Sequence, residues 1–154
     1  MQWMQASLPG LPVGLGGLGI RRVAQLAPSA FLASAASTRR LQDSILGSTS
    51  EQSDLQIDRT LEVWSSRVPV SVPSDTAAVK QRSWDKPQVD RDFNLLLNSQ
   101  QDSYSQARLR AVSAAHSSDW LNALPVSSCG LRLDDEAIRV AVGFRLGAKI
   151  CEPH

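Results

Sequence analysis

Apolar side chains recur along this chain mostly every three or four residues, the spacing that places them on one face of an α-helix. The clearest stripe consists of Ile57, Leu61, Trp64 and Val68. Ser53 and Gln56 stand at its start and fit a capping box, in which each side chain satisfies a free backbone N–H of the other. The segment therefore predicts an amphipathic helix that begins near Ser53.

Helical spacing also runs through the chain from Arg21 onwards. Ala27–Leu46 is rich in alanine and serine, and small residues of this kind allow another helix to pack closely. Its spaced apolar positions are Phe31, Ala35, Leu41 and Ile45. Pro28 either kinks one helix or starts a second, because proline is accepted in a first helical turn but not in a helix interior.

After residue 75 the helical spacing continues, interrupted by one proline and one polar turn. Asp75–Trp84 predicts a short helix, which we expect Lys86-Pro87 to break because proline has no backbone N–H. The apolar residues of the next predicted helix are Val89, Phe93, Leu96 and Leu97. After a turn at 98–101, Asp102–Ala115 predicts a further helix.

The most heavily punctuated stretch is Asp119–Gly147, in which Pro125 ends a first short helical turn. We expect Asp134 to cap the helix Asp134–Leu146, because negative charge suits a helix N-terminus. Gly147 suits the left-handed residue that often follows a helix. This helix is apolar on most sides, so we expect it to be packed between others in the core.

Together these segments predict a mainly α fold of about six helices, with no substantial β-sheet. Residues 1–20 form a Gly/Pro-rich segment, read as a loop with a short extended piece at 18–20. The remaining divisions that we expect are an N-terminal helical half at 21–67, a proline-containing linker at 68–74, a C-terminal helical half at 75–147 and a tail at 148–154.

The composition is that of an ordinary globular domain, with 154 residues, 42% hydrophobic and 20% charged. A net charge of +1 gives no strong attraction to nucleic acid or membrane. No run approaches the roughly 18 apolar residues that span a bilayer, and the N-terminus does not resemble a signal peptide. Two cysteines are no disulfide framework. We therefore expect an intracellular protein of the cytoplasm or nucleus, with no membrane association.

Gly14, Gly16 and Gly19 match the string G-x-G-x-x-G of dinucleotide-binding loops. That loop requires a buried strand before it, a helix after it and an acidic residue about 20 residues further on. Here Leu8–Pro12 contains two prolines, which a buried strand does not accommodate, and Asp43 lies inside a helical pattern. A glycine-rich turn is the better interpretation, and we expect no cofactor.

Three other groups suggest chemistry but have simpler explanations. The string His116–Asp119 contains serine, histidine and aspartate, yet catalytic triads are assembled by tertiary geometry, and helix capping explains these residues. Asp134-Asp135 is explained by capping as well. Cys151 and His154 have the spacing of half a zinc site, and zinc needs about four ligands. We treat them as weak metal candidates and assign no catalytic residue.

The residues best suited to contact nucleic acid are the arginines that occur in pairs. These are Arg21, Arg22, Arg39, Arg40, Arg108 and Arg110. A guanidinium group donates two parallel hydrogen bonds to a phosphate and fixes position without reading sequence. A solvated helix face is the more common explanation of such pairs.

Two stretches resemble a known family. Gly16–Ile20 (GGLGI), preceded by Trp3–Pro9 and followed by Ala27–Ser34 (APSAFLAS), resembles the segment after the polymerase core of non-LTR retrotransposon reverse transcriptases. Trp120–Pro125 (WLNALP) begins the second stretch, which continues with Gly130–Leu133 and Ala137–Gly147. It resembles the region that precedes a zinc-binding Cys-x-Cys-Gly segment and an endonuclease domain in retroelement proteins.

The resemblance implies a helical region between two enzyme domains, which in that family would hold the template–primer duplex by its backbone. A Tyr-x-Asp-Asp metal-binding pair and an endonuclease cluster are missing from this sequence, where Tyr104 is followed by Ser105. We therefore expect no enzyme activity, and a role in positioning RNA or an RNA/DNA hybrid through arginine–phosphate contacts. The alternative is a helical protein-interaction or structural module without nucleic-acid binding. The sequence leaves the oligomeric state open.

Overall fold

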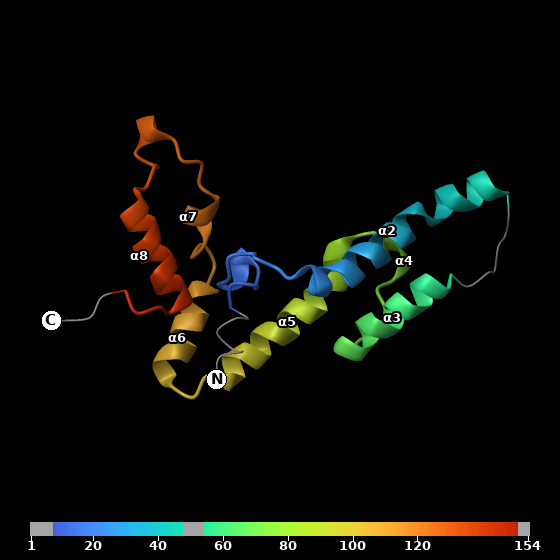
Figure 1. The fold of residues 1–154 in the computed structure, drawn as a ribbon, viewed down its shortest axis with the longest axis horizontal. Coiled ribbons are helices and arrows are strands. Elements are labelled where there is room, and N and C mark those ends of the chain that lie inside the picture. The colour runs from blue at the N-terminus through green and yellow to red at the C-terminus, as the bar shows by residue number, and fades with distance from the viewer. Residues whose placement is uncertain (1–7, 48–53, 151–154) are drawn as a thin grey trace. The chain divides into compact units, whose positions relative to one another are not determined.

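The structure, a computed structural model, describes residues 8–47 and 54–150 of the chain (Figure 1). Its longer helices are α2 (Val23–Leu46), α3 (Leu55–Arg67), α5 (Gln81–Ser99), α6 (Ser103–Val112) and α8 (Asp135–Leu146). Its shorter ones are α4 (Asp75–Ala78) and α7 (Asp119–Asn122), with 3-10 turns at Val13–Leu15 and Ser127–Cys129. No strand is present in these residues, so the predicted mainly α class is confirmed.

The chain forms two compact units. Unit 1 combines Met1–Ile20 with Asp92–His154, and unit 2 is Arg21–Arg91. This division differs from the one drawn from the sequence, since residues 68–74 lie inside unit 2. The reason is packing: Val68, the first residue of that segment, is buried, and the buried Ala78 and Trp84 follow the segment in the same unit.

The core of unit 2 is built around two tryptophans. Trp64 and Trp84 meet edge to face, with ring centroids 5.1 Å apart and planes at 80°. The other buried residues of this cluster are Leu32, Ala33 and Ala78. The indole N–H of Trp64 donates to the Trp84 carbonyl at 2.9 Å, and that of Trp84 donates to the Ala78 carbonyl at 2.7 Å. The second bond satisfies a carbonyl that the end of α4 would otherwise leave free.

Pro28 lies inside one continuous helix, α2, and does not start a second. As its sixth residue, Pro28 cannot donate to the carbonyl of Ala24, four residues earlier. The guanidinium of Arg67, from α3, donates to that carbonyl at 3.0 Å. A side chain of a neighbouring helix thus replaces the bond that proline removes.

The predicted helix break at Lys86-Pro87 is wrong, because Pro87 lies inside α5. The predicted helix 75–84 is instead α4 followed by the start of α5. An interior proline costs about 3 kcal/mol, and burial of Trp84 and Val89 on either side of Pro87 outweighs that cost. Local propensity is overridden here by tertiary packing.

The cap of α8 lies where the sequence predicts it, and the cap of α3 lies one residue later than predicted. Asp134 caps α8 as predicted, and its carboxylate accepts from the Ala137 N–H at 2.7 Å. Gly147 follows α8 in the left-handed conformation, with φ 71°. At α3 the cap is Asp54, which accepts from the Gln56 N–H at 2.9 Å. The predicted capping residue Ser53 lies outside the described residues.

The core of unit 1 contains the buried leucines Leu8, Leu11, Leu96 and Leu109. Leu146 of α8 packs against them only in part. The prediction that α8 is a core helix is wrong: Phe144 is 62% exposed, and the one fully buried residue among those described in α8 is Arg145. The apolar content of α8 does not determine which of its sides faces the core.

Candidate functional site

Arg145 joins three segments of unit 1 that lie far apart in the sequence. Its side chain is 3% exposed. The guanidinium donates from Nε to the Gly17 carbonyl at 3.1 Å and from Nη1 to the Ser117 carbonyl at 3.4 Å, and Nη2 also donates to the Val13 carbonyl. The glycine-rich loop, the turn before α7 and the end of α8 therefore meet at one side chain, which we call the Arg145 junction.

The Arg145 junction holds a buried positive charge on backbone oxygens. Burial lowers the pKa of Arg145 from its usual value, because desolvation disfavours the charged form. A guanidinium nevertheless stays protonated in proteins. Its hydrogen-bond partners are backbone carbonyls, and its place in the last turn of α8 adds the partial negative charge of a helix C-terminus. The carbonyl dipoles and the C-terminus of α8 together stabilise the buried guanidinium charge.

A second arginine, from α6, contacts the same C-terminal end of α8. Arg108 of α6 donates from Nη1 to the Arg145 carbonyl at 2.7 Å. That carbonyl is one of the last four of α8, which have no partner within the helix. Gly147 lies directly against this guanidinium, since a Cβ there would be 2.5 Å from Arg108 Cζ. The Arg108 guanidinium is therefore engaged in a structural contact within unit 1.

The second half of the glycine-rich loop, residues 16–20, offers no free N–H groups to a phosphate. The amides of Gly16, Gly17, Leu18, Gly19 and Ile20 all donate to carbonyls within residues 9–13. A dinucleotide loop needs such amides free and pointing at the pyrophosphate. The geometry instead supports the glycine-rich turn that the sequence analysis favours.

Glycine is required at Gly17 by a close approach of two backbone segments. A Cβ at this position would overlap the Leu11 carbonyl oxygen and lie 2.7 Å from that of Leu8. We expect Gly17→Ala to lower the free energy of unfolding by about 2 kcal/mol or more, because the backbone must shift. Gly14→Ala is the matched control, since a Cβ there meets no atom within 4 Å. Urea unfolding followed by circular dichroism measures both, and equal effects would contradict this explanation.

The His116–Asp119 string does not assemble a catalytic triad. His116 Nδ1 lies 2.8 Å from Asp119 Oδ2, but the His116 side chain is 88% exposed. The Ser117 hydroxyl donates to the backbone carbonyls of Val112 and Ala114, at 2.6 and 2.8 Å, and not to the imidazole. The serine closes the turn after α6 and is not oriented as a nucleophile.

His116 adopts a positive φ of 66°, which is unusual for a residue other than glycine. Asparagine tolerates this left-handed conformation, whereas a β-branched residue is strained in it. We expect His116→Val to destabilise the fold by about 1–2 kcal/mol and His116→Asn to stay within about 0.5 kcal/mol. Thermal unfolding of both variants tests this, and a neutral valine variant would contradict it.

The six arginines proposed for nucleic-acid contact fall into two groups. Arg21 is paired with Asp85, and Arg108 is bound to the end of α8, so both are engaged within their units. The exposed ones are Arg22, Arg39, Arg40 and Arg110. Arg22, Arg39 and Arg40 belong to unit 2 and Arg110 to unit 1.

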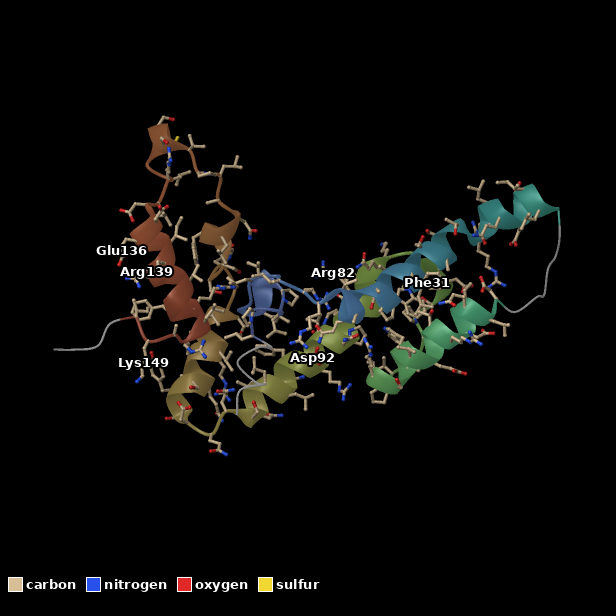
Figure 2. The ribbon with its side chains drawn as sticks, viewed as in Figure 1. Phe31, Arg82, Asp92, Glu136, Arg139 and Lys149 are labelled. Atoms are coloured by element: carbon tan, nitrogen blue, oxygen red, sulfur yellow. The ribbon has the colours of Figure 1, made fainter. Side chains whose placement is uncertain are left out.

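Other charged side chains on the α8 surface pair with each other. Figure 2 shows Glu136 and Arg139 together near the start of the helix, where Arg139 Nε donates to Glu136 Oε2 at 2.8 Å. Hydrogen bonds from Arg139 lower the pKa of the Glu136 carboxyl. This exposed pair is a local helix contact and indicates no binding site.

The weak metal candidates Cys151 and His154 lie outside the described residues, and Asp134 serves as a helix cap. Residues 8–47 and 54–150 contain no group of three side chains that could hold a metal ion. In the same ranges, no helix is long and apolar enough to cross a membrane.

The role of Arg145 was not predicted from the sequence. The signal was the position of this cation on an apolar helix, seven residues after Ile138 and three after Val142, and so on the same helical face. A charge within an apolar stripe indicates a buried polar contact. The carbonyls that it contacts could not be identified from this pattern.

Comparison of the chain with protein-family models, with curated proteins and with solved structures found no match.

Proposed function

We propose that this chain is a helical protein-interaction module without nucleic-acid binding, derived from a non-LTR retrotransposon reverse transcriptase polyprotein. One observation carries the interaction role. Every residue from Arg39 to Gly47, the last turns of α2 and its cap, is exposed. Three large aliphatic side chains lie in this segment, Leu41, Ile45 and Leu46.

Energetics explain why this end of α2 fits a partner surface. A helical segment without tertiary contacts is marginally stable in water. Full burial of one leucine or isoleucine side chain contributes about 1.5–3 kcal/mol. A partner that covers this end would therefore both order it and gain affinity. The same holds on a smaller scale for the exposed Phe144 of α8.

The Arg145 junction supports the proposed origin. The first stretch that carries the family resemblance contains Gly17, and the second contains Arg145. The hydrogen bond between them brings Gly16–Ile20 and the second stretch together in unit 1, while Ala27–Ser34 of the first stretch lies in unit 2. Contact between Gly16–Ile20 and the second stretch is expected if both belonged to one ancestral domain. The proposal assigns no catalytic residue to it.

A role in positioning RNA or an RNA/DNA hybrid is the second candidate, favoured by the exposed neighbours Arg39 and Arg40. Nucleic-acid binding draws its affinity from several phosphate contacts made together. Two of the six proposed arginines are engaged in internal contacts, which reduces the number available. The geometry therefore favours the protein-interaction role.

A pair of titrations separates the two roles. ANS has an apolar ring system and one sulfonate, whose charge is screened at high salt. Under that condition we expect ANS to bind the folded chain, and Leu41→Gln/Leu46→Gln to weaken its binding more than the matched variant Arg39→Gln/Arg40→Gln. We expect an RNA/DNA hybrid to bind no tighter than about 10⁻⁴ M at low salt. Micromolar hybrid binding that Arg39→Gln/Arg40→Gln weakens would establish the nucleic-acid role and overturn the proposal.

A further inference from the structure

The side of α2 that faces away from the core carries a heptad-spaced seam. The core-facing residues of α2 are Ser29, Leu32, Ala33 and Ala36. On the opposite side, at alternating steps of three and four, lie Ala24, Ala27, Phe31, Ser34, Thr38, Leu41 and Ile45. Alternation of this kind is the pattern of a coiled-coil interface. We call these seven residues the α2 seam.

The large residues of the α2 seam are open to solvent. Phe31, labelled on α2 in Figure 2, is 38% exposed, Leu41 is 62% and Ile45 is 72%. The positions that flank the seam are uncharged, including Ala30, Ala35, Ser37, Gln42 and Ser44. The charged residues Arg39, Arg40 and Asp43 fall on the other side of the helix. A helix that packs along the seam therefore meets no charge at its flanks.

The α2 seam is complementary to itself in one antiparallel register. When Ser34 of one copy lies opposite Thr38 of another, Phe31 lies opposite Leu41, and Ala27 opposite Ile45. Each layer then pairs a position of one heptad type with a position of the other, as antiparallel coiled coils require. The Ala27–Ile45 layers combine a small with a large side chain, and the Phe31–Leu41 layers pair two large ones.

The central layer has suitable hydrogen-bonding groups. The Thr38 hydroxyl donates to the Ser34 carbonyl of its own helix at 2.9 Å, so its oxygen keeps acceptor capacity even with the Gln42 amide 3.3 Å away. The Ser34 hydroxyl has one proton to donate. In the antiparallel register each Ser34 hydroxyl reaches the Thr38 oxygen of the other copy. Two symmetric hydrogen bonds would then fix the register.

We infer that the partner of the α2 seam is a second copy of this chain, paired antiparallel through α2. The inference rests on the proposed protein-interaction function and names its partner. The seam from Ala27 to Ile45 covers about 27 Å of helix at 1.5 Å per residue. An interface of one helix against another is smaller than standard stable interfaces, so the dimer is weak and concentration-dependent.

Sedimentation equilibrium of the full chain, from roughly 10 µM to roughly 1 mM, measures this dimer in the range where small interfaces dissociate. We expect Ile45→Glu to weaken dimerisation at least about tenfold, because it places a charge in an apolar layer. Leu55→Glu is the matched control: Leu55 is 69% exposed, close to the 72% of Ile45, but lies on α3. We expect its effect to stay within about twofold, as for most substitutions outside an interface core.

Disulfide trapping tests the register in a background with Cys129→Ser and Cys151→Ser. A mixture of Ser34→Cys and Thr38→Cys chains is expected to form mainly the mixed disulfide. A parallel pair would instead trap Ser34→Cys with itself, and that result would overturn the antiparallel register. Circular dichroism confirms that each variant is folded.

The outcomes separate this inference from the function on which it rests. A chain that stays monomeric at all concentrations, or a dimer that Ile45→Glu leaves unchanged, overturns the α2 pairing alone if ANS still binds the end of α2. Loss of ANS binding in the folded wild-type chain, with tight hybrid binding, overturns the proposed function itself.

Discussion

Replacement of Arg145 by methionine is expected to lower the free energy of unfolding of unit 1 by about 2–4 kcal/mol. Methionine fills a similar length of space but cannot donate hydrogen bonds. The carbonyls of Gly17 and Ser117 would remain in the fold without this donor, while the Val13 carbonyl keeps the Gly16 N–H. Each buried carbonyl left unpaired costs about 1–3 kcal/mol, offset in part because a charge no longer has to be desolvated.

Two variants separate the hydrogen-bonding role of Arg145 from its charge. Arg145→Lys keeps the charge but has one nitrogen in place of three, so we expect an intermediate loss of stability. Arg139→Met, on the exposed side of α8, should leave the unfolding midpoint unchanged. For Arg145→Ala, methylguanidinium at millimolar concentration should raise the unfolding midpoint by refilling the site. Arg145→Met with wild-type stability would show that the carbonyls find other partners.

The location of the effect is also predictable. Arg145 and its three carbonyl partners all belong to unit 1. Amide hydrogen exchange of Arg145→Met should therefore accelerate in α6 and α8, with α2 and α3 protected as in the wild-type chain. Uniform acceleration in both units would indicate that the chain unfolds as one cooperative body, with Arg145 contributing to all of it.

Local signals in the sequence were sufficient for several elements. The apolar stripe from Ile57 to Val68 predicts a helix, and the structure contains α3 there, with Trp64 fully buried. Asp134 caps the start of α8, and Gly147 follows its end in the left-handed conformation, as predicted. Such features depend only on residues within one or two turns, which is why spacing and capping rules locate them.

The remaining features depend on contacts between distant residues. Pro87 ends no helix, because packing of the α5 residues around it outweighs the lost hydrogen bond. The exposed residues of α8 include the apolar Ile138 and Phe144, while its buried residue is Arg145. Neither outcome can be obtained from composition or periodicity, since both are decided by which carbonyls and side chains lie opposite.

The candidate site could be predicted even less well from the sequence. The sequence singled out the glycine-rich loop and the His116–Asp119 string as separate possibilities for binding and catalysis. The structure joins them through Arg145, 128 residues from Gly17. Their backbone carbonyls, which a sequence motif does not describe, make the contacts. The function proposed for the chain therefore rests on exposed helix faces and not on either motif.

The largest effect in unit 2 is expected for Trp64→Ala, at about 3–5 kcal/mol of destabilisation. Trp64 is completely buried and packs against Trp84 at a centroid distance of 5.1 Å. Truncation leaves a large cavity, removes an edge-to-face contact of about 0.5–1.5 kcal/mol, and deprives the Trp84 carbonyl of its indole donor. Urea unfolding at constant temperature, followed by far-ultraviolet circular dichroism, measures the loss.

Trp64→Phe and a double-mutant cycle resolve the components of that loss. Phenylalanine keeps an aromatic ring but lacks the N–H, so we expect about 1–3 kcal/mol of destabilisation, less than for alanine. In the cycle, Trp64→Ala and Trp84→Ala should be clearly non-additive, because each removes the contact that the other also loses. Strict additivity would contradict direct coupling of the two rings. Since Trp64 belongs to unit 2, the matching change in hydrogen exchange should fall on α2 and α3, the reverse of the pattern for Arg145→Met.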